Sequence, residues 1–198
     1  MTQIFLNYRT TDQPYAGAML DEALSARFGS SAVFFASRSI PLGTSWEQEM
    51  FRAVAASTAV LVLIGRGWAD AVDEHGARRL DQPDDFVRRE ILHAFELGKQ
   101  VIPVLLETTR VPEEKLPPEL RKLAGLQEIK IGFRSSKPDI DRLAARLRIQ
   151  IPELRDAQPP PAENHAGSRV VNAENIDNSF MGDFAISGDF NLGTGRGD

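Results

Sequence analysis

The 198-residue sequence contains no cysteine, which excludes disulfide bonds, thiolate metal sites and a cysteine nucleophile. It also lacks an apolar run of the ~18 residues that a membrane-spanning helix requires, and its N-terminus does not have the charged and apolar segments of a signal peptide. The formal net charge is -5, and no basic stripe with interleaved aromatic residues offsets it. These absences predict a cytoplasmic protein that binds neither a membrane nor nucleic acid.

Apolar residues are instead arranged in an alternating series of strand and helix patterns. Partly β-branched runs at 4–8, 32–35, 59–64, 101–106 and 127–131 predict five strands. Helical spacing occurs at 15–24, 46–55, 87–95 and 140–147, and a short helix is expected near Pro117. Strict alternation predicts an α/β fold with helices on both faces of a parallel sheet. The simplest layout is flavodoxin-like, with strand order 2-1-3-4-5 and a ligand crevice at the carboxyl ends of the strands.

The composition changes after Ile151, which predicts a domain over 1–150 and a Pro/Ala-rich linker over 151–168. In the remaining segment, 169–198, Phe, Gly, Ile and Leu alternate with polar residues, and Gly-Asp-Phe occurs at both 182–184 and 188–190. This β-prone tail resembles the amyloid-forming signalling motifs of some immune proteins, whose strands stack in register. A hairpin packed on the domain and a disordered tail are the alternatives.

The helix that contains Glu90 carries the main chemical hypothesis. Val87, Ile91 and Ala94 form its apolar stripe, and Glu90 projects about 60° away from Val87, judged from about 100° of rotation per residue. A carboxylate at the edge of the stripe can face a cleft while its helix is held rigidly. The alternative is a surface glutamate paired with nearby arginines, contributing roughly 0.3–0.5 kcal/mol.

Several separated segments, in order, resemble a TIR domain of the bacterial type found in NAD-cleaving and immune-signalling proteins. They are Ile4-Phe5-Leu6-Asn7-Tyr8-Arg9, Val33-Phe34-Phe35, Ile40-Pro41-Leu42-Gly43-Thr44-Ser45-Trp46, the strand from Ala59 to the tryptophan at Trp68, the helix around Glu90, and Pro103, Pro112 and Leu116-Pro117. The resemblance covers residues 1 to about 150. The sequence departs from the family pattern at Asn7 (usually Ser), Thr10 (often Arg) and Ala36 (often Asp), all near the expected ligand mouth.

The resemblance implies that NAD+ is a substrate, with no cofactor and no metal, and that Glu90 is the catalytic residue. It also places Tyr8, Arg9, Trp46 and Phe86 at the nucleotide cleft. An aromatic ring can stack on nicotinamide or adenine, and an arginine can bind a phosphate bidentately. Each has a plainer alternative: Trp46 and Phe86 as core anchors of their helices, Arg9 as a solvated loop charge, and Tyr8 as a packing residue.

Other candidate sites fail on spacing. His75, His93 and His165 have no carboxylates at metal-ligand spacing, and Gly65-Arg66-Gly67 lacks the frame of a phosphate loop. Asp84-Asp85 is expected to cap its helix, and Ser45 is expected to cap the preceding one rather than act as a nucleophile.

The resemblance therefore implies an NAD+ hydrolase of bacterial immune signalling that releases nicotinamide and leaves ADP-ribose or a cyclic form. It further implies homo-oligomers through TIR–TIR contacts of the loop at 36–43, with a partner immune protein reached through the tail. The alternative from another class is a non-catalytic TIR adaptor. A third option is an enzyme that transfers ribosyl groups from free nucleosides.

Overall fold

The computed structural model describes residues 2–13 and 15–154 of the chain. This part contains an all-parallel, five-stranded sheet with the order β2-β1-β3-β4-β5. The strands are β1 (Ile4–Asn7), β2 (Val33–Phe34), β3 (Ala59–Ile64), β4 (Gln100–Leu106) and β5 (Ile129–Ile131). The predicted flavodoxin-like order is confirmed. The predicted tail at 169–198 and most of the predicted linker lie outside the described residues.

The central strand shows why the sheet is buried on both faces. All six residues of β3 are buried; β4 pairs with all of them in parallel register, and β1 pairs with the first four, Ala59 to Val62. A strand with a helix layer above and below it has no solvent-facing side, so its sequence is apolar throughout rather than alternating. The run Ala-Val-Leu-Val-Leu-Ile of β3 is the result.

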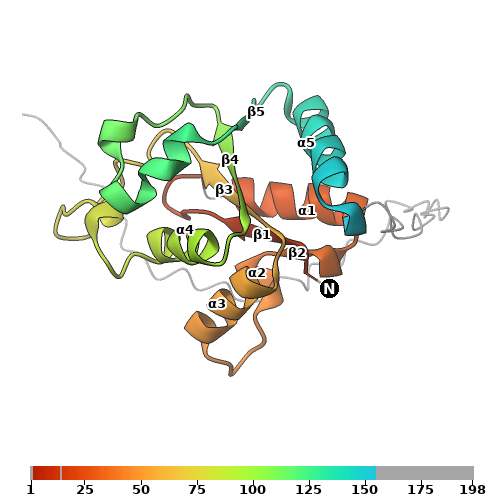
Figure 1. Cartoon of the computed structure of the whole chain (residues 1–198), viewed down its shortest axis with the longest axis horizontal. Helices are drawn as coiled ribbons and strands as arrows, with labels where there is room; N and C mark the ends of the chain where they lie inside the picture. The colour runs from red at the N-terminus through yellow and green to blue at the C-terminus, as the bar shows by residue number, and fades with distance from the viewer. Residues whose placement is uncertain (1, 14, 155–198) are drawn as a thin grey trace, which may run out of the picture. The chain divides into compact units, whose positions relative to one another are not determined.

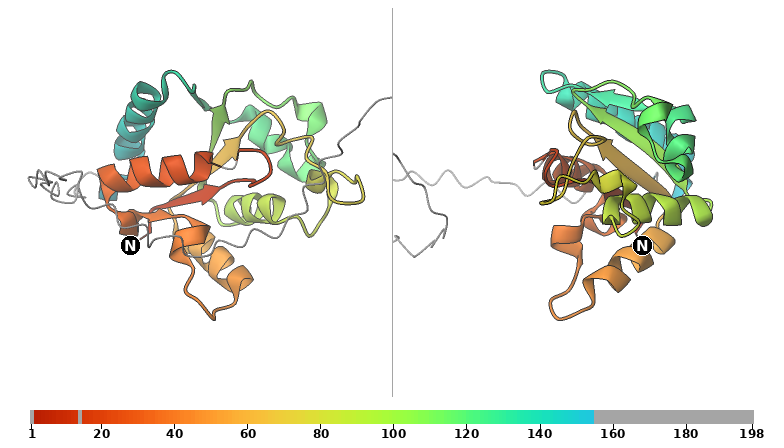
Figure 2. Two further views of the ribbon diagram at one scale, coloured as in Figure 1. Left: turned by 180° about the vertical axis from the view of Figure 1, so that it is seen from behind. Right: turned by 90° about the vertical axis from the view of Figure 1, so that its left-hand side faces the viewer.

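Two helix layers cover the sheet (Figures 1 and 2). Helices α1 (Ala16–Phe28) and α5 (Ser136–Gln150) lie side by side and pack on Ile4, Leu6 and the residues that share their face. Helices α3 (Trp46–Ala56) and α4 (Phe86–Glu96) pack on the opposite face, together with the 3-10 helix η4 (Pro118–Gly125). Phe5, between Ile4 and Leu6, belongs to this second core. Successive side chains of a strand point to opposite faces of the sheet and therefore contribute to two separate hydrophobic cores.

The structure differs from the sequence-based expectation in local detail. The segment predicted as a loop at 36–43 begins with a short helix, α2 (Ala36–Ser39), because the Ser39 hydroxyl accepts a hydrogen bond from the Phe35 amide and closes the turn. Ser45 occupies the N-cap position of α3, but its side chain makes no capping bond. The helix expected near Pro117 is a 3-10 helix. Four shorter 3-10 helices complete the secondary structure: η1 (Ser30–Ala32), η2 (Arg79–Asp81), η3 (Glu113–Lys115) and η5 (Pro152–Leu154).

The loops that follow β1 and β3 are joined by Asp12. Its two carboxylate oxygens accept hydrogen bonds from the amides of Gly65 (2.7 Å) and Gly67 (2.8 Å). A side chain at Gly65 would collide with Asp12 and Gln13. Within residues 2–13 and 15–154, no helix has the length and apolarity needed to cross a membrane.

Candidate functional site

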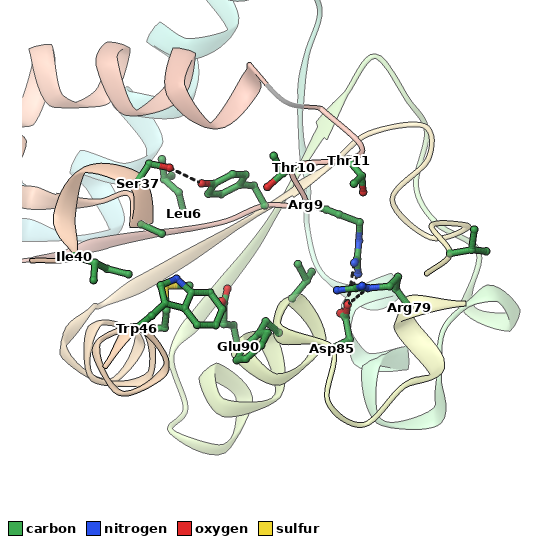
Figure 3. A pocket seen from close by; sticks show the side chains of 16 residues that line it. Leu6, Arg9, Thr10, Thr11, Ser37, Ile40, Trp46, Arg79, Asp85 and Glu90 are labelled. Atoms are coloured by element: carbon green, nitrogen blue, oxygen red, sulfur yellow. Dashed lines mark hydrogen bonds and ion pairs between the residues drawn. The ribbon is translucent and has the colours of Figure 1, made fainter. Parts of the chain in front are cut away.

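A cavity of about 460 Å³ opens at the carboxyl end of β1, between α2, α3 and the beginning of α4. Figure 3 shows its lining side chains, with Glu90 and Trp46 toward one end and Arg79 and Asp85 toward the other. The chain leaves β1 toward β2 on one side, and β3 lies on the other, so the cavity sits where the strand order reverses. Ligands of open parallel sheets bind at such a point.

Glu90 lies on the wall of this cavity and is only 3% exposed. Its Oε2 accepts a hydrogen bond of 2.7 Å from Nδ2 of Asn7, the last residue of β1. The same Nδ2 donates to the backbone carbonyl of Val87, one turn earlier in α4, at 3.1 Å. Among the described residues, no group donates to Oε1 of Glu90. The carboxylate is therefore fixed to the sheet through one oxygen.

Burial raises the pKa of Glu90 from an ordinary 4.5 to about 8. The hydrogen bond from Asn7 favours the charged form, the negative charge of Asp85 opposes it, and Arg9 favours it. Desolvation outweighs these contacts because a buried carboxylate loses the water that would stabilise its charge. A carboxyl group that titrates near neutral pH inside a cavity is a common feature of functional sites.

The other end of the cavity contains an ion cluster around Asp85. The Nη1 and Nη2 groups of Arg9 each donate to Asp85 at 2.9 Å, and Nε of Arg79 contacts the same carboxylate at 3.3 Å. Asp85 also accepts from the Arg88 amide, so it caps α4 as the sequence predicted. Burial would raise the pKa of Asp85, but these hydrogen bonds and the charge of Arg9 hold it below the ordinary value.

An aromatic pair lines the cavity near Glu90 (Figure 3). The rings of Trp46 and Phe86, the first residues of α3 and α4, meet edge to face with centroids 4.3 Å apart. Trp46 is 43% exposed, although both residues line the cavity. The Arg89 guanidinium lies over the Phe86 ring and pairs with Glu47 of α3. The pair thus packs the two helices together and leaves part of the indole accessible to a ligand.

The remaining predicted residue, Tyr8, is half-buried on the cavity wall. Its ring packs against Phe35 with centroids 5.2 Å apart, and its hydroxyl is 3.2 Å from that of Ser37 in α2. Thr10 and Ala36, two of the positions at which the sequence departs from the pattern it resembles, both line the cavity as well. These departures leave this part of the cavity with small, uncharged side chains.

The structure brings together all five residues that the sequence singled out: Tyr8, Arg9, Trp46, Phe86 and Glu90. Arg9 is not a solvated loop charge, since it is 6% exposed and both of its Nη groups face Asp85. Sequence reasoning missed the contact of Asn7 with Glu90 and the presence of Arg79 in the cavity. Arg79 lies in a 3-10 helix between strand and helix patterns, where periodicity carries no signal.

The described residues contain no cluster of three or more His, Asp or Glu side chains placed to bind a metal ion. The site consists instead of two buried carboxyl groups and an aromatic pair: Asp85 is paired with Arg9 and Arg79, whereas Glu90 has no arginine or lysine partner among the described residues. Such a set can hold a cationic ring near the carboxylate and an anionic group near Arg79.

Comparison with known proteins agrees with this fold. The sequence profile of the TIR domain family matches residues 4–148, so the chain belongs to the TIR domain family. No curated protein matches the chain significantly.

Among solved structures, the chain is similar to the TIR domains of the activated Roq1 resistosome that recognises the pathogen effector XopQ. The identity is 14%, the TM-score is 0.57, and the match covers 74% of this chain and 99% of the other. A second similar structure is the TIR domain of the Toll-related receptor TRR-2 from Hydra magnipapillata (13% identity, TM-score 0.46, 79% and 100% coverage). A third is a TIR-STING receptor from C. gigas (20% identity, TM-score 0.45, 70% and 38% coverage). At these identities, the Roq1 match supports the fold alone.

Proposed function

We propose that this TIR domain is an NAD+ hydrolase whose catalytic residue is Glu90. The observation that supports the proposal is a buried carboxyl group that lies on the wall of a cavity beside a partly exposed indole. Cleavage of the bond between ribose C1′ and the pyridinium nitrogen releases neutral nicotinamide from a cation, so no general acid is needed. One carboxylate next to the ribose suffices, because it stabilises the positive charge that develops on the sugar.

The cavity supplies groups for the rest of the dinucleotide. Trp46 offers its accessible face to a flat ring, and Phe86 supports the indole from the side. Arg79 is the guanidinium that we assign to a phosphate, since it contacts Asp85 through Nε only and is 42% exposed at its side chain. Arg9 was expected to bind a phosphate, but both of its Nη groups donate to Asp85. We therefore assign Arg9 a structural role in the cavity wall.

The protonation state of Glu90 couples binding to chemistry. With a pKa of about 8, the carboxyl group of the free protein is mainly neutral at pH 7. A pyridinium ring in the cavity brings a positive charge near it and favours the ionised form. Substrate binding should therefore release a proton. Isothermal titration in buffers of different ionisation enthalpy measures this release directly.

The product follows from the group that captures the ribose. When water attacks, its oxygen bonds to C1′, one proton is lost to solvent, and ADP-ribose is formed. When a nucleophile on the bound nucleotide attacks, the product is cyclic. Glu90 has the same role in both cases, because the positive charge on the sugar precedes capture.

Self-association is part of the proposal. Leu42 is fully exposed, and it lies with Ser37 and Ile40 in the segment 36–43 that borders the cavity. An exposed apolar side chain beside a site offers a contact for a second TIR domain, which would cover the open cavity. By analogy with immune TIR proteins, we place the chain in immune signalling, with the tail at 169–198 as the segment that reaches a partner protein.

The test is nicotinamide release from NAD+ by the full chain, at high protein concentration and with a crowding agent. Wild type should release nicotinamide, and Glu90→Gln should lower the rate by at least about 100-fold. Glu96→Gln is the matched control, because Glu96 lies on the same helix but is exposed and outside the cavity. Equal rates for wild type and Glu90→Gln would contradict the assignment of Glu90. Release from free nucleosides but not from NAD+ would indicate a nucleoside ribosyl transferase. No release under any condition would favour the adaptor.

A further inference from the structure

Asn7 is the only residue that donates a hydrogen bond to the Glu90 carboxyl group among the described parts of the chain. It ends β1, it is fully buried, and it is not among the residues that line the cavity. Its side chain crosses from the sheet to α4, where one amide nitrogen serves two acceptors in consecutive turns of the helix. A residue in this place cannot touch a ligand directly.

The chemistry of the second acceptor fixes the orientation of the amide. The Val87 carbonyl can only accept a hydrogen bond, so the NH2 group of Asn7, and not its oxygen, must face α4. Glu90 therefore receives a donor whichever protonation state it adopts. The Asn7 Oδ1 is buried and has no hydrogen-bond partner within residues 2–13 and 15–154. The Asn7 amide donates to acceptors on Glu90 and Val87, while its own Oδ1 acceptor stays unsatisfied. This arrangement favours a role for Asn7 in orienting groups of α4 over a role in stabilising its own surroundings.

The consequence for Glu90 is a difference between its two oxygens. Oε2 is bound to Asn7, and Oε1 is left for the cavity. We propose that Asn7 is a positioning residue for Glu90: its amide holds Oε2, directs Oε1 toward the ligand and favours the negative form of the carboxyl group. The catalytic role of this contact rests on the proposed function, whereas the hydrogen bond between Asn7 and Glu90 is present in the structure itself.

Other charged groups around Glu90 act in both directions. Asp85, at the start of the same helix, disfavours the negative form, and Arg9, after β1, favours it. On α3, Glu47 is paired with Arg89, the neighbour of Glu90 on α4. His93, one turn further along α4, packs against Phe51 and contacts Glu96. Asn7 is the neutral member of this set, so its replacement changes hydrogen bonding without adding or removing a charge.

The experiment follows the titration of Glu90 by NMR in the full chain labelled with 13C at the glutamate carboxyl carbon. The Glu90 signal is identified by its loss in Glu90→Gln. Asn7→Ser is too short to reach α4, and Asn7→Leu keeps the volume but has no donor. Burial raises the pKa of Glu90 to about 8, so the wild-type midpoint is expected near this pH. Both variants should raise the midpoint by about one pH unit, as expected for the loss of a hydrogen bond to a charged group.

The matched control is Ser57→Ala. Ser57 is also buried, and it donates to the backbone carbonyl of Val54. It lies at the C-terminal end of α3, whereas the N-terminal end of this helix borders the cavity. Its replacement should leave the Glu90 midpoint unchanged. Within folded wild type, the Asn7 NH2 signals should titrate with the same midpoint as Glu90, and this titration should vanish in Glu90→Gln. An unchanged midpoint in folded Asn7 variants, or Asn7 signals that ignore the Glu90 titration, would overturn the inference.

Activity separates this inference from the proposed function. If Glu90 must be ionised for NAD+ cleavage, Asn7→Ser should lower kcat/KM about tenfold at pH 7 and recover most of that loss above pH 9. A purely structural defect would lower activity equally at every pH, and that result would count against positioning. If the NMR midpoint moves but no variant or wild type cleaves NAD+, the contact between Asn7 and Glu90 stands and the hydrolase proposal fails.

Discussion

Replacement of Glu90 by glutamine should stabilise the protein, and the gain should grow with pH. The neutral amide keeps an oxygen that can accept the Asn7 hydrogen bond, but it never acquires the buried charge. In wild type the folded-state pKa of Glu90 lies at about 8, above the ordinary 4.5. The folded protein therefore binds this proton more tightly than the unfolded chain, and the stability due to the neutral carboxyl group is lost as pH rises toward 8.

The magnitude follows from the two pKa values. The interval between 4.5 and about 8 corresponds to about 5 kcal/mol, at 1.36 kcal/mol per unit. This is an upper value for the full effect above pH 8, and it should accumulate at about 1.4 kcal/mol per pH unit between pH 5 and 8. The difference between Glu90→Gln and wild type is the useful quantity, because the titration of all other groups cancels in it.

The assay is urea unfolding of both proteins at each pH from 5 to 9, followed by far-UV circular dichroism. Glu22→Gln on the exposed side of α1 serves as the control and should change the stability by less than about 0.5 kcal/mol. A difference between Glu90→Gln and wild type that is constant from pH 5 to 9 would refute the reasoning. It would mean that Glu90 is already ionised, or already solvated, in the folded protein.

Three further predictions concern activity and the ion cluster. In wild type, kcat/KM for nicotinamide release should rise about tenfold per pH unit below pH 8 and level off above it, since the ionised form of Glu90 is required; a flat profile from pH 6 to 9 would contradict this. Arg9→Met should lower the free energy of unfolding in urea by about 3–5 kcal/mol, because Asp85 would keep a buried charge without its main partner. A decrease of less than about 1 kcal/mol would show that the ion pair contributes little to stability. Trp46→Ala and Arg79→Ala should each raise KM for NAD+ about tenfold, because each variant loses a stacking or phosphate contact worth about 1–3 kcal/mol. The kcat of both variants should stay within a few fold of wild type. Unchanged KM values would show that neither residue binds NAD+.

The sheet could be predicted from sequence because burial on both faces leaves a strong pattern. The six apolar residues from Ala59 to Ile64 form β3 with unchanged bounds, and β4 begins only one residue before the predicted run at 101–106. The second strand is harder: four residues were expected over 32–35, and only Val33–Phe34 pair with β1. An edge strand that ends in a 3-10 turn on one side and a short helix on the other has little periodicity to measure.

The residues of the candidate site could be brought together from helical spacing and the family pattern, but the long-range contacts between them could not be predicted. Spacing placed Glu90 at the edge of an apolar stripe, and the structure places it on the cavity wall. Its degree of burial could not be foreseen, because it results from β1 lying against α4. For the same reason, nothing local indicated that Arg9 would meet Asp85, 76 residues later in the chain. Such pairings arise only when the fold brings the carboxyl end of a strand to the start of a distant helix.

Asp85 performs several tasks at once, and this affects how its variants must be interpreted. The same carboxylate begins α4, anchors the arginine that follows β1 and steadies the 3-10 helix that contains Arg79. Any substitution at this position would release three segments together, so a loss of enzymatic function there would say nothing about chemistry. The reverse also holds: a natural sequence that changes this aspartate should show accompanying changes at both arginines, which makes the trio a signature to look for when related chains are aligned.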